Sequence, residues 1–141
     1  GRFLTSGGLG TMGYALPAAV GVKVADSSRQ AMVICGDGSF QMSMNELAAV
    51  RTRNLDLKIL LLDNGVLGLV RQIQNTPPYH GSFGVSLEGS PDYAAIAAAY
   101  GIPSIRADRE AQVEDALDRF LNQPGSCLLI VRVDPDVTTN D

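Results

Sequence analysis

Two turns carry the residues of this 141-residue chain that are best suited to chemistry. The stretch GDGSF places Asp37 between Gly36 and Gly38 after the apolar run QAMVIC, and LLLDN ends the next apolar run with Asp63 and Asn64. Ligands of open α/β sheets bind at such carboxyl strand ends. Glycines there let backbone N–H groups approach an anion, but a carboxylate repels a phosphate unless a divalent cation lies between them. Mg²⁺ held by one or two protein oxygens and by substrate phosphates fits both turns. Either motif alone is equally typical of an ordinary turn.

A third glycine motif suggests a different ligand. SGGLGTMGYALPAA contains Gly8, Gly10 and Gly13 in the G-x-G-x-x-G order of dinucleotide-binding turns. Such a turn follows a hydrophobic strand and has an acidic residue about 20 positions further on. Here the preceding GRFLTS is half polar, and Asp26 follows Gly13 by only 13 positions. NAD or FAD binding through this motif is therefore the minor alternative, and a tight turn with close helix packing is the favoured interpretation.

The elements that position these motifs alternate along the chain. Short apolar runs separated by amphipathic segments predict a doubly wound parallel sheet with helices on both faces. Ser43 and Glu46 are expected to form a capping box, and Ser90 to cap a later helix that has Pro91 in its first turn. Pro17 is expected to kink or restart the first helix. We expect strands at 30–35, 57–63, 104–107 and 127–133, helices at 12–24, 43–53, 66–74, 90–100 and 113–121, and a long loop at 75–90.

Composition limits the function. The net charge of −4 without a basic stripe argues against nucleic-acid binding. No apolar run reaches the length of a membrane span and no secretory signal is visible, so we expect cytoplasm or an organelle stroma. Cys35 and Cys127 are interpreted as buried thiols, and His80 cannot complete a zinc site with them. The chain is one domain, 1–141, and because it opens at Gly1 without an initiator Met we expect it to be incomplete at its N-terminus.

The pattern from Gly36 to Asn64 resembles thiamine-diphosphate enzymes. More narrowly, SGGLGTMGYALPAA, GDGSFQMSMNEL and LLLDNGVLGLVRQIQ resemble the carboxyl-terminal, diphosphate-binding domain of acetolactate (acetohydroxyacid) synthases, from about Gly7 to Gln74 and more loosely to Pro135. The resemblance implies thiamine diphosphate and Mg²⁺ as cofactors, with FAD possible but held mainly by another domain. It implies decarboxylation of a 2-oxo acid such as pyruvate and carboligation to a second 2-oxo acid, in branched-chain amino acid biosynthesis. The alternatives are another 2-oxo acid decarboxylase or oxidase of this superfamily, a dinucleotide-binding oxidoreductase domain, and a non-catalytic interaction domain.

The resemblance also implies roles for individual residues. The Gly10 carbonyl and the Met12 backbone would meet the aminopyrimidine, and the Met12 side chain would support the bent cofactor. Asp37, the Asn64 side chain and the Val66 carbonyl would ligate Mg²⁺. The cofactor-binding set that the resemblance implies is Gly10, Thr11, Met12, Gly36, Asp37, Gly38, Ser39, Asn64, Gly68 and Leu69.

The substrate side is implied less fully. Leu69 and Ile73 would face the substrate pocket, and the loop 75–90 corresponds loosely to a lid over the active site. Biosynthetic acetohydroxyacid synthases typically carry tryptophan where Ile73 stands, so the acceptor oxo acid stays open. No catalytic residue is assigned to this chain, because the family's activating glutamate belongs to a separate pyrimidine-binding domain. Glu46 is expected to be used as a helix cap, and the other candidates lie in a loop or on an exposed helix face: Glu88, Glu110 and Glu114.

The missing glutamate has consequences for partners. We expect the chain alone to be inactive and to work with a pyrimidine-binding domain of the same or a partner subunit. The resemblance implies a homo-oligomer, dimer or tetramer, acting on small 2-oxo acids, with no nucleic-acid or membrane partner.

Overall fold

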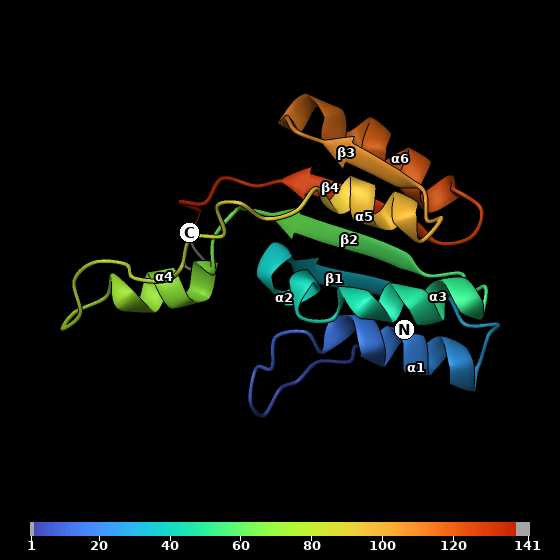
Figure 1. Ribbon diagram of the computed structural model, residues 1–141, viewed down its shortest axis with the longest axis horizontal. Coiled ribbons are helices and arrows are strands. Elements are labelled where there is room, and N and C mark those ends of the chain that lie inside the picture. The colour runs from blue at the N-terminus through green and yellow to red at the C-terminus, as the bar shows by residue number, and fades with distance from the viewer. Residues whose placement is uncertain (1, 138–141) are drawn as a thin grey trace.

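The computed structural model describes residues 2–137 and contains a four-stranded sheet (Figure 1). Its strands are β1 (Met32–Gly36), β2 (Lys58–Asp63), β3 (Ser104–Ala107) and β4 (Cys127–Arg132), in the order β1-β2-β4-β3. Every pairing is parallel, as the alternating pattern predicts. Because β1 and β2 are neighbours with Gly36 opposite Leu62, the two polar turns begin at the same edge of the sheet.

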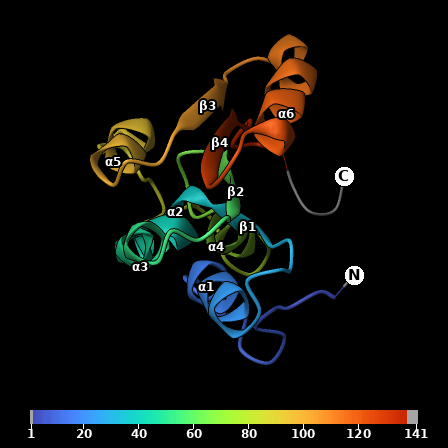
Figure 2. The same ribbon diagram turned by 90° about the vertical axis from the view of Figure 1, so that its right-hand side faces the viewer.

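Helices cover both faces, which confirms the predicted α/β class. Figure 2 shows α6 on one side of the sheet and α2, α3 and α5 on the other. No helix within residues 2–137 is both long enough and apolar enough to cross a membrane. The helices are α1 (Ala15–Ala25), α2 (Asp37–Gln41), α3 (Leu47–Thr52), α4 (Gly68–Gln74), α5 (Tyr93–Ala99) and α6 (Val113–Asn122), with short 3-10 segments at Met44–Glu46 and Glu110–Gln112.

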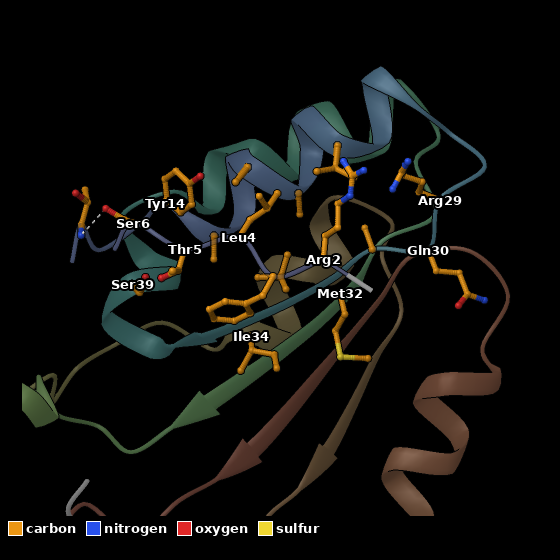
Figure 3. A pocket seen from close by; sticks show the side chains of 18 of the residues that line it. Arg2, Leu4, Thr5, Ser6, Tyr14, Arg29, Gln30, Met32, Ile34 and Ser39 are labelled. Atoms are coloured by element: carbon orange, nitrogen blue, oxygen red, sulfur yellow. Dashed lines mark hydrogen bonds between the residues drawn. The ribbon is translucent and has the colours of Figure 1, made fainter. Parts of the chain in front are cut away.

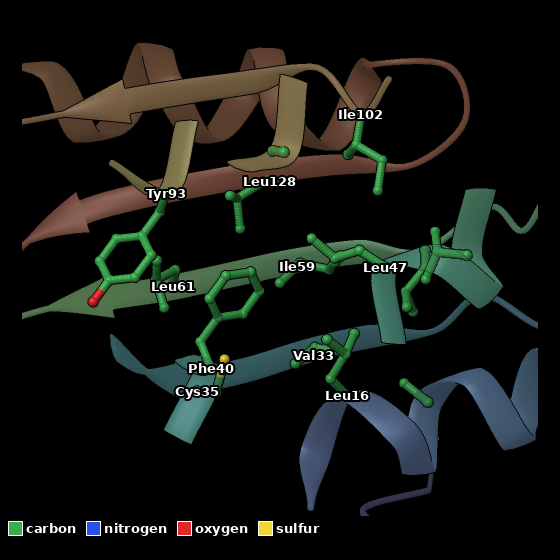
Figure 4. Packing of buried hydrophobic residues seen from close by; sticks show 14 of the residues in the cluster. Leu16, Val33, Cys35, Phe40, Leu47, Ile59, Leu61, Tyr93, Ile102 and Leu128 are labelled. Atoms are coloured by element: carbon green, nitrogen blue, oxygen red, sulfur yellow. The ribbon is translucent and has the colours of Figure 1, made fainter. Parts of the chain in front are cut away.

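The larger core lies between the strands and the helices α1, α2, α3 and α5 (Figure 4). Alternate residues of β1 and β2, such as Val33 and Ile59, point into it because side chains of a strand alternate between faces. Phe40 is fully buried there, and its ring meets that of Tyr93 edge to face with centroids 5.8 Å apart. Burial of each such ring contributes about 2–3 kcal/mol. This packing fixes α2, which starts at Asp37, against the end of β1.

The second face is covered only in part. Phe120 of α6 packs over β3 and β4. On β1 and β2 the side chains of Met32, Ile34 and Leu62 stay 46%, 59% and 38% exposed. A cavity of about 950 Å³ runs beside β1, between α1 and residues 2–6 (Figure 3). Parallel sheets ordinarily bury both faces, so this side of β1 is the open part of the fold.

The start of α1 differs from the prediction. The helix begins at Ala15 rather than at residue 12, because Gly10 and Gly13 have φ angles of +60° and +80° that a helix cannot continue. Pro17 lies in the first turn, where no N–H is needed for the helix ladder, so it neither kinks nor restarts the helix.

Both predicted caps are wrong. Neither Ser43 nor Glu46 makes a side-chain cap, and the segment between them is a separate 3-10 turn. At α5 the cap is Asp92, whose Oδ1 accepts from the backbone N–H groups of the next turn at 2.9 and 3.3 Å. Ser90 instead donates to the carbonyl of Leu87 at 2.6 Å. Ser43 is buried, and Ser90 Oγ also accepts from Gln41 Nε2 at 2.9 Å, a contact across 49 positions that the local pattern does not reveal.

Candidate functional site

Asp37 joins the ends of the two neighbouring strands. Its side chain is 2% exposed, Oδ1 accepts from the N–H of Gly38 at 2.9 Å, and Oδ2 accepts from the N–H of Gly65 at 2.8 Å. Gly65 follows Asn64 in the turn after β2. The two polar turns that the sequence singles out are therefore in direct hydrogen-bond contact, and Asp37 is held by both.

The charge around Asp37 is unbalanced. Burial raises the pKa of its carboxyl, the two backbone N–H groups oppose that effect in part, and the neighbouring Asp63 raises the pKa further. Asp63 itself pairs with Arg132, at 3.3 Å between Oδ1 and Nη1. A nearby cation favours the ionised form of a carboxyl, so a divalent ion at this edge would stabilise the Asp37 carboxylate.

The turn after β2 places the other candidate ligands. Asn64 Oδ1 accepts from the N–H of Val66 at 3.1 Å, a turn stabilised by its own side chain. Val66 forms an antiparallel bridge to Ser86, and the N–H of Leu67 donates to the carbonyl of Val85 at 2.8 Å. Residues 65–67 are therefore held in place by the segment 85–87, and Asn64 and Val66 lie in the same turn.

This pairing overturns the helix expected from Val66 onward. The helix α4 begins at Gly68, so Val66 shares no helical face with Val70 and Ile73. Those two side chains are 40% and 55% exposed, and α4 has no buried residue.

The glycine-rich turn reaches the same edge. The N–H of Gly13 donates to Ser39 Oγ at 2.8 Å, which connects the turn before α1 to the residue two after Asp37. The turn is closed by Ser6, whose Oγ accepts from the N–H of Thr11 at 3.0 Å. The three motifs that the sequence treats separately thus meet at one place.

Gly38 lies where they converge. A Cβ atom on it would come within 2.6 Å of Leu67 Cδ2, 3.1 Å of Met12 Cε and 3.3 Å of Leu87 Cδ1. Side chains from three chain segments surround this glycine closely, and a side chain there requires its neighbours to move. Leu67 and Leu87 are contacts that sequence reasoning missed. Leu87 lies in a loop without periodicity, so no local pattern points to it.

The remaining predicted residues fall into two groups. Gly36 precedes Asp37, and a Cβ on Gly68 would lie 3.1 Å from Asn64 Nδ2, so both border the strand ends. Leu69 and Ile73 are 63% and 55% exposed on α4, which stands away from the sheet in Figure 1. The structure therefore does not bring these two side chains to the strand ends. The residues of the site that line one end of the cavity beside β1 are Gly10, Thr11, Met12 and Ser39.

The donor set fits Mg²⁺ and a diphosphate. A carboxylate, an amide oxygen and a backbone carbonyl are hard oxygen ligands of the kind that Mg²⁺ takes together with substrate phosphates. Within residues 2–137 no group of three or more His, Cys, Asp and Glu side chains could hold a metal ion. An ion at this edge would therefore rely on Asp37, on amide and backbone oxygens, and on its ligand's own phosphates.

None of the glutamates considered from the sequence is among the side chains that surround Gly38 or among the groups that bond to Asp37. Glu46 does not cap a helix, so the reason first given for setting it aside is wrong. Three others are exposed at the surface: Glu88, Glu110 and Glu114.

Comparison with known proteins agrees with this site. The family model described as "Thiamine pyrophosphate enzyme, C-terminal TPP binding domain" matches residues 1–131. The chain is 47% identical over 133 residues to the acetolactate synthase isozyme 2 large subunit of Escherichia coli (strain K12), which covers 94% of this chain and 24% of that protein. It is 43% identical over 136 residues to an acetolactate synthase of Arthrospira platensis, covering 96% and 24%. It is 40% identical over 137 residues to the chloroplastic acetolactate synthase of Arabidopsis thaliana, covering 92% and 20%.

The chain spans about a quarter of the length of the curated relatives from Escherichia coli and Arthrospira platensis. The family match, the resemblance at three motifs and their convergence at Gly38 concern the same residues. The chain belongs to the thiamine pyrophosphate enzymes, as a C-terminal TPP-binding domain of the acetolactate synthase large-subunit type.

Proposed function

We propose that this chain supplies the diphosphate- and Mg²⁺-binding half of an acetolactate synthase-type active site. The reaction is decarboxylation of a 2-oxo acid, pyruvate, and carboligation to a second 2-oxo acid. The observation that carries the proposal is the hydrogen bond from the Gly65 N–H to Asp37 Oδ2, because it joins the two strand ends whose oxygens would share one ion. The names of the relatives support the reaction class.

In this proposal Asp37, the Asn64 side chain and the Val66 carbonyl hold Mg²⁺. Asp37 is oriented before the ion arrives, because both of its oxygens accept backbone N–H groups. Its burial raises the pKa of the free carboxyl, so the ion would bind the ionised form and offset the unfavourable burial of charge.

The diphosphate is assigned to Gly38, Ser39 and the backbone at Gly68 and Leu69. The close packing around Gly38 supports this, since a side chain at position 38 would press on Leu67, Met12 and Leu87, which border the proposed diphosphate site. Gly10, Thr11 and Met12 would border the aminopyrimidine, and the Met12 side chain, which already lies against Gly38, would support the cofactor from below. When bound, thiamine diphosphate supplies the electron sink that loss of CO₂ from a 2-oxo acid requires.

The other parts of the active site are assigned to a pyrimidine-binding domain of the same or a partner subunit. That domain would bring the activating glutamate and cover α4, so that Leu69 and Ile73 face the substrate; their exposure supports a missing cover. A homo-oligomer of dimer or tetramer size, any FAD held mainly elsewhere, and no activity of this chain by itself belong to the same proposal. The word "chloroplastic" in the name of the Arabidopsis relative supports a plastid stroma as the compartment, and the Escherichia coli relatives support a bacterial cytoplasm.

Calorimetric titration of the native polypeptide that carries this chain tests the proposal. We expect thiamine diphosphate to bind only when Mg²⁺ is present, and Asp37→Ala to weaken that binding by more than tenfold. Asp115→Ala is the matched control, because Asp115 is an exposed aspartate that pairs with Arg119 on α6, a helix that packs over β3 and β4.

Three outcomes would contradict the proposal. Binding of NAD without binding of thiamine diphosphate and Mg²⁺ would indicate a dinucleotide domain. A folded Asp37→Ala variant that binds the cofactor as tightly as the parent, with Mg²⁺ present, would indicate a non-catalytic domain. Equal losses in Asp37→Ala and Asp115→Ala would show that the site lies elsewhere.

A further inference from the structure

The helix α4 projects from the rest of the fold (Figure 1). It stands beside the sheet with the loop that follows it (Figure 1), and none of its side chains is buried. Residues 65–67 before it are held by the segment 85–87. At its other end Gln74 bonds to Phe83, which belongs to the same projecting loop. These contacts do not fix α4 against the sheet.

The segment 133–136, here called the strap, follows β4 and connects α4 to the end of β2. The Val133 N–H donates to the carbonyl of Asp63 at 2.9 Å, which binds the strap to the end of β2. Arg71 of α4 donates from Nη1 to the carbonyl of Pro135 at 3.0 Å and from Nη2 to Asp136 Oδ1 at 2.5 Å. The strap therefore contacts the chain at two places, at the end of β2 through Asp63 and in the middle of α4 through Arg71.

The residue before the strap strengthens this bracing. Arg132 pairs with Asp63, and its guanidinium lies 3.7 Å from the position that a Cβ on Gly65 would occupy. The strand β4 and the strap therefore line the outside of the turn that holds Asn64 and Val66.

The geometry of Arg71 suits a positioning role better than a simple surface ion pair. Its side chain is 31% exposed and that of Asp136 is 74% exposed, so the charge attraction alone contributes little. A guanidinium offers several donors in one rigid plane, and here two of them reach two different acceptors. One acceptor is the backbone carbonyl of Pro135. Because a backbone carbonyl does not move when a side chain rotates, this contact fixes the position of Arg71 more firmly than a contact with a side chain would.

The strap contacts the back of the helix that carries the proposed substrate-facing residues. Positions 69 and 73 share one face of a helix, and position 71 lies about 200° away from each at 100° per residue. Arg71 therefore reaches the strap on the side opposite to Leu69 and Ile73. A tie on that side fixes where their shared face points.

We propose that Arg71 is a positioning residue, which anchors α4 to the strap and thereby sets the placement of Leu69 and Ile73 toward the substrate. The inference rests on the proposed function for the identity of the substrate, a 2-oxo acid. The Mg²⁺ ligands are assigned to the strand ends, and Gly68 and Leu69, whose backbone is assigned to the diphosphate, begin α4 directly after the turn that the bridge between Val66 and Ser86 holds. Loss of the anchor should therefore affect substrate binding more than cofactor binding.

The test compares Arg71→Ala, Asp136→Ala and the control Arg119→Ala in the native polypeptide that carries this chain. Arg119 is the matched control because it too forms an exposed ion pair with an aspartate, at 3.4 Å, on α6. Amide hydrogen exchange reports on α4, and steady-state kinetics with pyruvate reports on the site. For Arg71→Ala we expect at least tenfold faster exchange in α4 with unchanged exchange in β2. We also expect the KM for pyruvate to rise about fivefold or more, with kcat and the dissociation constant of thiamine diphosphate within twofold.

Two further comparisons separate positioning from general destabilisation. Asp136→Ala should have a smaller effect than Arg71→Ala, because the carbonyl of Pro135 still accepts from Arg71. The exchanged pair Arg71→Asp with Asp136→Arg should bring KM back toward the parent value when compared with Arg71→Asp alone. Arg119→Ala should match the parent throughout.

Unchanged α4 exchange in Arg71→Ala would overturn the inference. So would a loss of kcat, KM and cofactor affinity together with faster exchange throughout the sheet, since that pattern indicates a structural role only. A parent polypeptide that does not turn over 2-oxo acids would refute the proposed function instead. The exchange comparison alone would then decide whether Arg71 positions α4.

Discussion

Replacing Gly38 by alanine tests whether the three motifs meet as closely as the structure indicates. The added methyl would lie 2.6 Å from Leu67 Cδ2 and near two further side-chain ends. Overpacking of this kind costs about 1–3 kcal/mol. Gly38 is also part of α2, where alanine is better than glycine by up to about 1 kcal/mol. The net expectation is a loss of about 1 kcal/mol of unfolding free energy, or about 3 °C in Tm for a domain of this size.

Gly21→Ala provides the matched comparison. Gly21 also lies in a helix, α1, but a Cβ there would have nothing within 4 Å. Only the higher helix propensity of alanine over glycine applies here, so this variant should be more stable than the parent by up to about 1 kcal/mol. The two substitutions are chemically identical and are expected to differ by about 2 kcal/mol, in opposite directions.

Thermal and urea unfolding of both variants measure this difference. If Gly38→Ala matched Gly21→Ala in stability, the surrounding side chains would have room to move and the convergence at Gly38 would be refuted. Calorimetry adds a second readout: under the proposed function the methyl also occupies the diphosphate cradle, so cofactor affinity should fall by about tenfold or more in Gly38→Ala only.

Two further predictions concern titrating groups. Burial and the neighbouring Asp37 raise the pKa of the Cys35 thiol to about 12. Iodoacetamide at pH 8 should therefore leave Cys35 unlabelled in the folded chain and label it after unfolding, which peptide mass spectrometry can show. Labelling of the folded chain at the rate of a free thiol would contradict the burial of Cys35. In the absence of metal, burial raises the pKa of Asp37 above 3.8, so the folded state holds its proton more tightly than the unfolded state. Stability from this group is therefore full below pH 3.8 and is lost as pH rises through the folded pKa. The stability of Asp37→Asn relative to the parent should thus increase from pH 4 to pH 7 without Mg²⁺, and a difference that is constant or decreases over this range would be inconsistent with the buried charge.

The main features of the site were predictable because they depend on topology. Apolar runs such as the one ending at Cys35 are recognisable as buried strands, and parallel strands present their carboxyl ends at one edge. The contact between Asp37 and Gly65 follows from those two facts once the strands are neighbours. The tight turn expected at Gly10 and Gly13 agrees with their φ angles of +60° and +80°, although the helix after it begins at Ala15 and not at residue 12 as expected.

The rest depends on contacts between distant segments. Val66 pairs with Ser86 and leaves the helix that its spacing suggested, because a bridge of 20 positions is invisible to local periodicity. Ser43 has the sequence of a cap but is buried, and Asp92 caps a helix where the preceding Ser90 looked equally suitable. Apolar side chains such as Val70 and Ile73 indicate that their helix face is suited to burial. They do not indicate which part of the protein, or which other chain, covers that face.

The edge strand β1 has a consequence for handling the protein. Along its free side β1 offers main-chain donors and acceptors that no other strand within residues 2–137 uses, and its sequence MVICG contains neither charge nor proline. Natural proteins commonly block such edges with lysine, proline or a covering helix, since an open edge recruits strands from other molecules. The free edge of β1 therefore favours self-association, and a partner that covered β1 would also keep the protein from aggregating.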